Sequence, residues 1–207
     1  MTCRRICKLL SLTVYSIDYR LMPQFSADDA LSDAVHAFRA ISLEKGKRKL
    51  VVMGSSSGGQ LAAQVSQLEN GNGIDGVLLR SPVTCDAANL PLRWKGKHKS
   101  MSTAFHTSLL SSAALTAENR TKEMLPLERE VEELKGMPRH WVQVCTNDIY
   151  YSDGACYAED LEEAGVELRV DVVRGWPHTF WLKAPLLKKA VKVDEDMIEG
   201  LRWLLKG

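Results

Sequence analysis

A glycine-flanked serine between an apolar strand and a helical pattern constrains this fold more than any other feature of the sequence. Gly54-Ser55-Ser56-Ser57-Gly58 directly follows the apolar run Leu50–Met53 and precedes a helical pattern over about 59–68. A short apolar run without alternation is typical of the buried middle of a parallel sheet. Glycines are expected at 54 and 58 because side chains there would collide with the strand and the helix. The motif predicts a sharp turn that presents the Ser56 hydroxyl at the sheet edge.

The helix that follows this turn is expected to assist chemistry at Ser56. Its first N–H groups have no partner inside the helix and carry a partial positive charge. The backbone N–H of Ser57 is therefore placed to donate a hydrogen bond to a developing oxyanion. The alternatives are a turn that binds nothing and a phosphate-binding loop. The phosphate loop is disfavoured because no Lys follows the glycines.

Short aliphatic runs alternate with helical patterns along the chain, which predicts a parallel sheet built from strand–helix–strand units. Ser26 and Asp29 form a capping pair at the start of one helix. Residues 81 to about 138 lose this rhythm and hold four prolines, as a lid or cap insertion would. The 207 residues are thus predicted to form a single α/β domain (1–207) with helices on both faces of a mostly parallel sheet. Strands are expected at 13–17, 50–53, 76–79, 141–145 and 168–173, and helices at 26–43, 59–68, 154–164 and the C-terminal end.

A serine nucleophile needs a base, and that base needs a carboxylate to orient it. Asp148 and His178 each follow one of the last two predicted strands. Because parallel strands end at one edge of a sheet, both side chains are expected to converge on Ser56. Asp153 is the rival acid, although its place at the start of a helix favours a role as a cap or as a first-turn carboxylate. The other histidines lie on a helix, in the irregular segment or before a strand, and none has a comparable place: His36, His98, His106 and His140.

Composition argues against several other classes of protein. The formal net charge of +1 lacks the basic surplus of a nucleic-acid-binding protein. No stretch approaches the roughly 18 apolar residues of a membrane span, and the N-terminus is a poor signal peptide. Five scattered cysteines favour a reducing compartment, so the cytoplasm is the expected location. Cys3 and Cys7 fit a metal half-site or a buried helix face, and the absence of a second ligand pair favours the helix face.

Four segments together resemble the hormone-sensitive-lipase-like branch of the α/β hydrolases. The resemblance implies an α/β-hydrolase fold in which Ser56, Asp148 and His178 form a catalytic triad. It implies cleavage of a small-molecule carboxylic ester through an acyl-enzyme, with no cofactor and no metal. Residues 77–84 also resemble fungal members from secondary-metabolite gene clusters. The four segments are Asp18–Pro23, similar to D-Y-R-L-A-P; Gly54–Gly59, similar to G-D-S-A-G-G; Asp148 with the following Tyr157-Ala158 and Ala164-Gly165-Val166; and Gly175–Phe180, which fits G-x-x-H-x-F.

One departure from the family pattern bears on activity. The family's H-G-G-G segment, which supplies further oxyanion-hole N–H groups, precedes the helix that contains Cys3 and Cys7, and this chain starts at that helix. The resemblance therefore predicts an N-terminally truncated fold that lacks the first strands, including one beside the strand that ends at Ser56. Loss of one oxyanion donor typically costs about 10²–10³ in turnover.

Two further functions thus stand beside ester hydrolysis. One is a catalytically impaired relative that binds a small molecule or assists a pathway. The other is acyl transfer to an alcohol other than water, which the same three side chains would support. The sequence carries no indication of the ester's identity or of the oligomeric state.

Overall fold

Four parallel strands form the centre of the fold, in the order β1-β2-β3-β4. A computed structural model describes residues 2–86, 89–98 and 120–206. The register pairs Ser55 with Arg80 and Cys145 with Val173, so the carboxyl ends of the strands lie along one edge. Four of the five predicted strands are confirmed: β1 Val51–Ser55, β2 Gly76–Arg80, β3 His140–Cys145 and β4 Leu168–Val173.

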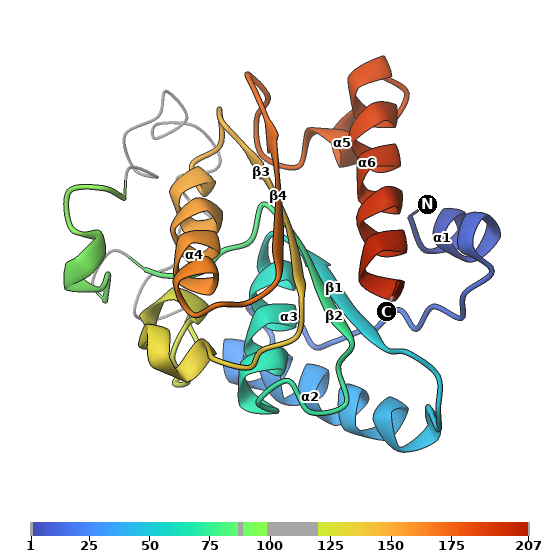
Figure 1. The fold of residues 1–207 in the computed structure, drawn as a ribbon, viewed down its shortest axis with the longest axis horizontal. Helices are drawn as coiled ribbons and strands as arrows, with labels where there is room; N and C mark the ends of the chain where they lie inside the picture. Colours follow the sequence, from blue (N-terminus) through green and yellow to red (C-terminus); the bar gives the residue numbers. More distant parts are fainter. Residues whose placement is uncertain (1, 87–88, 99–119, 207) are drawn as a thin grey trace.

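Helices cover both faces of this sheet (Figure 1). On one face, α3 (Ser57–Leu68) and α4 (Tyr151–Glu163) contact the strands, and α2 (Ala27–Glu44) packs outside α3. On the other face, α6 (Lys188–Leu205) contacts all four strands, with α1 (Thr2–Leu10) beside it. Each face has its own apolar cluster. The three layers confirm the predicted α/β class with helices on both faces.

The capping pair predicted for α2 is present. The Ser26 hydroxyl oxygen accepts a hydrogen bond of 3.1 Å from the Asp29 N–H, and the Asp29 carboxylate accepts one of 2.9 Å from the Ser26 N–H. Leu31 and Phe38 lie seven residues apart on the buried side of the helix. The cap fixes where α2 begins, and its apolar stripe fixes which side faces α3.

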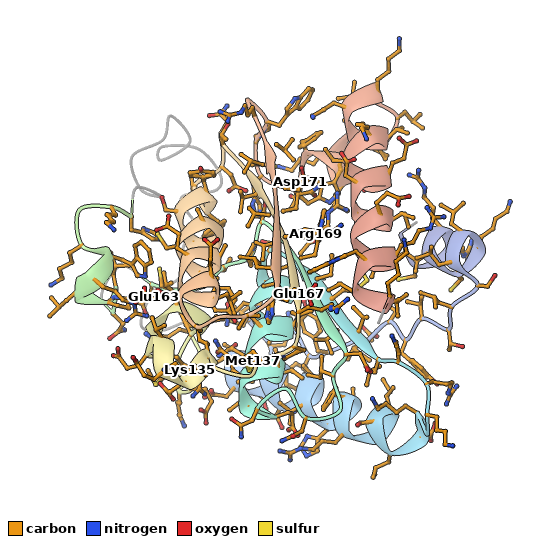
Figure 2. All side chains as sticks on the ribbon, in the orientation of Figure 1. Lys135, Met137, Glu163, Glu167, Arg169 and Asp171 are labelled. Atoms are coloured by element: carbon orange, nitrogen blue, oxygen red, sulfur yellow. The ribbon has the colours of Figure 1, made fainter. Side chains whose placement is uncertain are left out.

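β4 is the edge strand of the described sheet, and its charged side chains lie on the side that faces α6 (Figure 2). The Arg169 guanidinium lies 4.6 Å from the centre of the Trp203 ring. Asp171 accepts a 2.7 Å hydrogen bond from the side chain of Gln143. Charged side chains on an edge strand discourage pairing with another chain, because such pairing would strip them of water.

The prediction of a strand at 13–17 was wrong. This segment forms no ladder, and β1 pairs with β2 alone among the described strands. An apolar channel with a volume of about 430 Å³ is lined by Leu12 and Val14 from this segment and by Val51 and Met53 from β1. The β-branched pattern of 13–17 therefore has no neighbouring backbone to pair with, and a strand exists only through such pairing. The predicted truncation stays a prediction.

The two cysteines of α1 do not lie on a buried face, so that prediction was wrong. Cys3 is exposed and Cys7 is half-buried. The side of α1 that faces α6 runs through Ile6, which is 2% exposed, and Leu10 four residues later. Burial on a helix follows this i, i+4 stripe, and the cysteines stand beside it.

The described part of the predicted lid, 81–86, 89–98 and 120–138, is irregular and holds only short 3₁₀ helices. Leu125, Leu127 and Leu134 are fully buried, and the last two belong to the apolar cluster of α3 and α4. Residues 120–138 therefore contribute to the hydrophobic core rather than to a lid. Residues 87–88 and 99–119 lie outside the described residues, so the lid itself stays a prediction. The 3₁₀ helices are η1 Leu92–Trp94, η5 Pro126–Glu128 and η6 Val131–Leu134.

Candidate active site

Ser56 occupies the sharp turn between β1 and α3 that the sequence predicts. Its backbone has φ 56° and ψ −124°, a conformation that costs a non-glycine residue about 1–3 kcal/mol. The Ser56 N–H donates a 3.0 Å hydrogen bond to the carbonyl of Arg80, which ties the turn to the end of β2. The tie holds the strained residue in place at the carboxyl edge of the sheet.

A side chain would collide with the backbone of the turn at position 54 but not at position 58. A Cβ atom on Gly54 would lie 1.9 Å from the carbonyl oxygen of Gly58, so the turn admits no side chain there. A Cβ atom on Gly58 would meet nothing within 4 Å, because that residue lines the open channel beside β1. The predicted collision at 58 was wrong.

The three side chains singled out from the sequence meet at one edge of the sheet. His178 Nε2 lies 2.8 Å from Ser56 Oγ, and His178 Nδ1 lies 2.7 Å from Asp148 Oδ2. Asp148 follows β3 and His178 follows β4, as the parallel topology requires. Asp148 is fully buried and His178 is 6% exposed. The imidazole therefore bridges the hydroxyl and the carboxylate through its two different nitrogens.

Tyr150 supports this arrangement, and sequence reasoning missed it. Its backbone N–H donates a 2.9 Å hydrogen bond to Asp148 Oδ1, so both carboxylate oxygens have partners. Its ring lies edge-on to the His178 imidazole, with the ring centres 5.1 Å apart. The position two residues after the acid was the available signal, because a carboxylate at a turn often accepts from that N–H.

Asp153, the rival acid, serves a different part of the fold. Its Oδ2 accepts hydrogen bonds from the N–H groups of Thr84 and Cys85 at 2.8 and 3.3 Å. Its Oδ1 lies 3.0 Å from His98 Nε2. Asp153 lies in the first turn of α4, as predicted, and its carboxylate holds the loop after β2 against that turn.

Of the remaining histidines, His36 and His140 lie outside this arrangement. His36 is exposed on α2, and His106 lies outside the described residues. His140 is fully buried at the start of β3, where its Nδ1 lies 2.7 Å from the carbonyl of Pro138. Burial lowers the pKa of His140 to about 4, so the ring is neutral and donates that hydrogen bond.

Ser57 is the first residue of α3, so its N–H has no partner four residues back inside the helix. The channel reaches this turn, since Ser55 and Gly58 are among its lining residues. Most of the other lining side chains are aliphatic or aromatic. The apolar channel therefore ends at the neighbours of Ser56, at the N-terminus of α3.

A family model described as the alpha/beta hydrolase fold matches residues 1–182. The chain belongs to the α/β-hydrolase fold family. The matched residues include both the serine turn and the segment that carries His178. The match confirms the resemblance to the hormone-sensitive-lipase-like branch. Within the described residues, none of this α/β hydrolase's helices is both long and apolar enough to cross a membrane.

Known relatives of this α/β hydrolase include fungal proteins and a solved cyclase. The FAD-linked oxidoreductase pytB of Aspergillus terreus is 30% identical over 98% of the chain but only 26% of that protein. The versiconal hemiacetal acetate esterase of Dothistroma septosporum is 25% identical over 99% of the chain and 67% of that protein. The crystal structure of vibralactone cyclase matches with a TM-score of 0.85 and 26% identity, over 98% of the chain and 64% of that structure. The chain thus spans between a quarter and two thirds of these relatives.

Proposed function

We propose that the protein hydrolyses carboxylic esters, with Ser56 as nucleophile, His178 as general base and acid, and Asp148 as the orienting carboxylate. One observation carries the proposal: a continuous line of contacts at 2.7 and 2.8 Å joins Asp148, His178 and Ser56 through opposite nitrogens of the imidazole. This order allows a proton to leave the hydroxyl while the carboxylate stabilises the resulting imidazolium.

The reaction proceeds in two steps of acyl transfer. Ser56 Oγ attacks the ester carbonyl carbon and passes its proton to His178 Nε2, giving a tetrahedral oxyanion that the Ser57 N–H stabilises. The bond to the alcohol oxygen then breaks, and the alcohol takes the proton from His178. Water then attacks the acyl-enzyme and gives one proton to His178. The bond from the acyl carbon to Ser56 Oγ breaks, Ser56 Oγ takes that proton from His178, and the carboxylic acid leaves. Asp148 keeps Nδ1–H of His178 directed at the carboxylate throughout.

The substrate class follows from the channel and from the relatives. An apolar channel lined by Ser55 and Gly58, the neighbours of the serine turn, favours the ester of a small apolar molecule. The relative named versiconal hemiacetal acetate esterase supports a short acyl group and a place in secondary metabolism. All five cysteines carry free thiols, which supports the cytoplasm as location.

The test uses a fluorophosphonate probe, which labels an activated serine covalently. The wild-type protein should be labelled at Ser56 and should hydrolyse p-nitrophenyl acetate, and the Ser56→Ala variant should do neither. Ser57→Ala is the matched control, because it removes the adjacent hydroxyl and keeps the backbone N–H. Labelling that persists in Ser56→Ala, or that is lost in Ser57→Ala alone, would contradict the assignment of the nucleophile.

A second candidate is binding of a small apolar molecule without turnover. It is supported by the channel, which runs along β1, on the edge that has no neighbouring strand within the described residues. This function predicts saturable binding of an apolar fluorescent probe that is equal in wild type and Ser56→Ala, together with no p-nitrophenyl acetate turnover. Turnover that depends on Ser56 would exclude it as the main function.

A further inference from the structure

A second cluster of reactive side chains lies outside the candidate active site, at the base of the irregular segment. Cys85 Sγ lies 3.5 Å from His98 Nε2, and the same Nε2 lies 3.0 Å from Asp153 Oδ1. Cys85 and Asp153 are 7% and 2% exposed, and the His98 side chain is 9% exposed. The three residues come from the loop after β2, the segment after η1 and the first turn of α4. Among the described residues, this is the one group of three possible metal ligands that converge within 4.8 Å.

The geometry differs from that of a nucleophile with its base and acid. In the active-site arrangement, Ser56 and Asp148 contact opposite nitrogens of His178. In this cluster, the thiol and the carboxylate both approach the single atom Nε2 of His98. A triad imidazole takes a proton at one nitrogen while the carboxylate orients it through the other, and this cluster lacks that arrangement. Convergence of a sulfur, a nitrogen and an oxygen on a common point is instead how ligands surround a cation.

The ligand types and spacings match zinc. Zn²⁺ takes Cys sulfur at about 2.3 Å, His nitrogen at about 2.0–2.1 Å and carboxylate oxygen at about 2.0–2.2 Å. Tetrahedral bonds of those lengths separate the ligand atoms by roughly 3.3–3.6 Å. The sulfur–nitrogen distance of 3.5 Å lies in that range, the nitrogen–oxygen distance of 3.0 Å is below it, and the 4.0 Å from the sulfur to Asp153 Oδ2 is above it. Binding would therefore require small movements of the side chains.

The carboxylate is also held as a metal ligand usually is. Asp153 Oδ2 accepts hydrogen bonds from the backbone N–H groups of Thr84 and Cys85, which orients Oδ1 toward His98. Contacts of this kind around a ligand fix its direction and are part of most metal sites. Because one partner is the N–H of Cys85 itself, the same hydrogen bonds also bring the thiol into place.

We propose that Cys85, His98 and Asp153 form a zinc site that joins the loop after β2 and the segment after η1 to α4. The metal would take three protein ligands and a fourth ligand such as water. It would hold the loop after β2 and His98 against the first turn of α4, with the fourth position open to water as in other zinc sites that have three protein ligands. The three positions, at 85, 98 and 153, have no spacing that a sequence pattern for zinc would contain.

Binding requires the Cys85 thiol to lose its proton. Burial raises the pKa of this thiol well above its usual value, and the neighbouring Asp153 carboxylate adds to the rise. A bound Zn²⁺ would favour the thiolate form of Cys85 instead, because the charge of the metal deprotonates a coordinated thiol. The thiol proton therefore passes to solvent as the Zn–S bond replaces the S–H bond.

The experiment is titration of the purified, chelator-treated chain with Co²⁺ and Zn²⁺. Wild type should bind about one Co²⁺ per chain and show thiolate-to-cobalt charge-transfer absorption, which Zn²⁺ then displaces. Cys85→Ser and His98→Ala should each weaken binding by at least about 10- to 100-fold, as losing even the support of a ligand does. Circular dichroism of each metal-free variant checks that it is folded. His98→Ala is the second variant because His98 is the least buried of the three ligands.

The matched controls are Cys7→Ser and His36→Ala, which remove one thiol and one exposed histidine away from the cluster. Both should bind metal as wild type does. Absence of stoichiometric binding, absence of charge-transfer absorption, or equal binding in Cys85→Ser and Cys7→Ser would overturn the proposal. Loss of binding in Cys7→Ser alone would overturn it as well, because it would place the metal on α1. Esterase activity is not a readout here, so this test stands apart from the proposed function.

Discussion

Replacing Gly54 by Ala should damage both the stability and the chemistry of the serine turn. The new Cβ would lie 1.9 Å from the Gly58 carbonyl oxygen, 2.2 Å from its carbon and 2.6 Å from the Gly59 nitrogen. All three are backbone atoms of the first turn of α3, so no side chain can move aside. Real Cβ atoms essentially never come within 3.0 Å of a heavy atom beyond their own residue and its chain neighbours. The turn would therefore have to open by about 1 Å to bring the Cβ of residue 54 to that distance from the Gly58 carbonyl oxygen.

The cost follows from that movement. Bond-angle distortions of about 15° cost about 4 kcal/mol, and overpacking a filled site costs about 1–3 kcal/mol. We therefore expect Gly54→Ala to lower the free energy of unfolding by about 3–5 kcal/mol, a large part of the roughly 5–15 kcal/mol that a domain has. A shift of about 1 Å at Ser56 would also break its 2.8 Å contact with His178, which predicts labelling by fluorophosphonate at least about 10²-fold slower.

Gly58→Ala is the matched control for this substitution. Its Cβ meets nothing within 4 Å, and Ala favours a helix over Gly by up to about 1 kcal/mol. Urea denaturation should therefore give a free energy of unfolding equal to or slightly above that of wild type. If Gly54→Ala stays within about 0.5 kcal/mol of wild type with unchanged labelling, or if the two variants behave alike, the steric reasoning is refuted.

Three further predictions rest on buried polar groups. Asp148→Asn keeps the volume of the acid but favours the wrong tautomer of His178, so fluorophosphonate labelling should slow by about 10⁴-fold while the melting temperature barely changes; labelling at the wild-type rate would contradict the role of the acid. The pKa of His140 is about 4 in the folded protein and 6.5 in the reference state, so between these pH values the unfolded chain binds a proton that the folded chain does not. The free energy of unfolding should therefore fall by up to about 3 kcal/mol as the pH drops from 6.5 to 4. A His140→Gln variant with the same pH dependence would refute this. Asp194→Asn should cost about 3 kcal/mol in urea denaturation, because it leaves the buried Arg80 guanidinium without its 2.9 Å ion pair; a cost below about 1 kcal/mol would show that the ion pair contributes little.

Local pattern alone was enough for much of this fold. The apolar runs that became β1 to β4, the capping pair at Ser26 and the glycine–serine turn after β1 are all short-range signals. The positions of Asp148 and His178 after successive parallel strands were readable too, because parallel strands end at one edge of a sheet. Their convergence on Ser56 followed from chain order rather than from any contact visible in the sequence.

Tertiary structure decided what depends on a partner distant in sequence. Thr13 to Ile17 has the composition of a strand, yet strand structure needs a neighbouring backbone and none of the described strands supplies one. Burial on α1 depended on which side faces α6, so Ile6 is covered and Cys3 is exposed. Cys85 and His98 come from two separate segments that both meet Asp153 on α4. The cluster therefore depends on tertiary contacts that no local sequence pattern predicts.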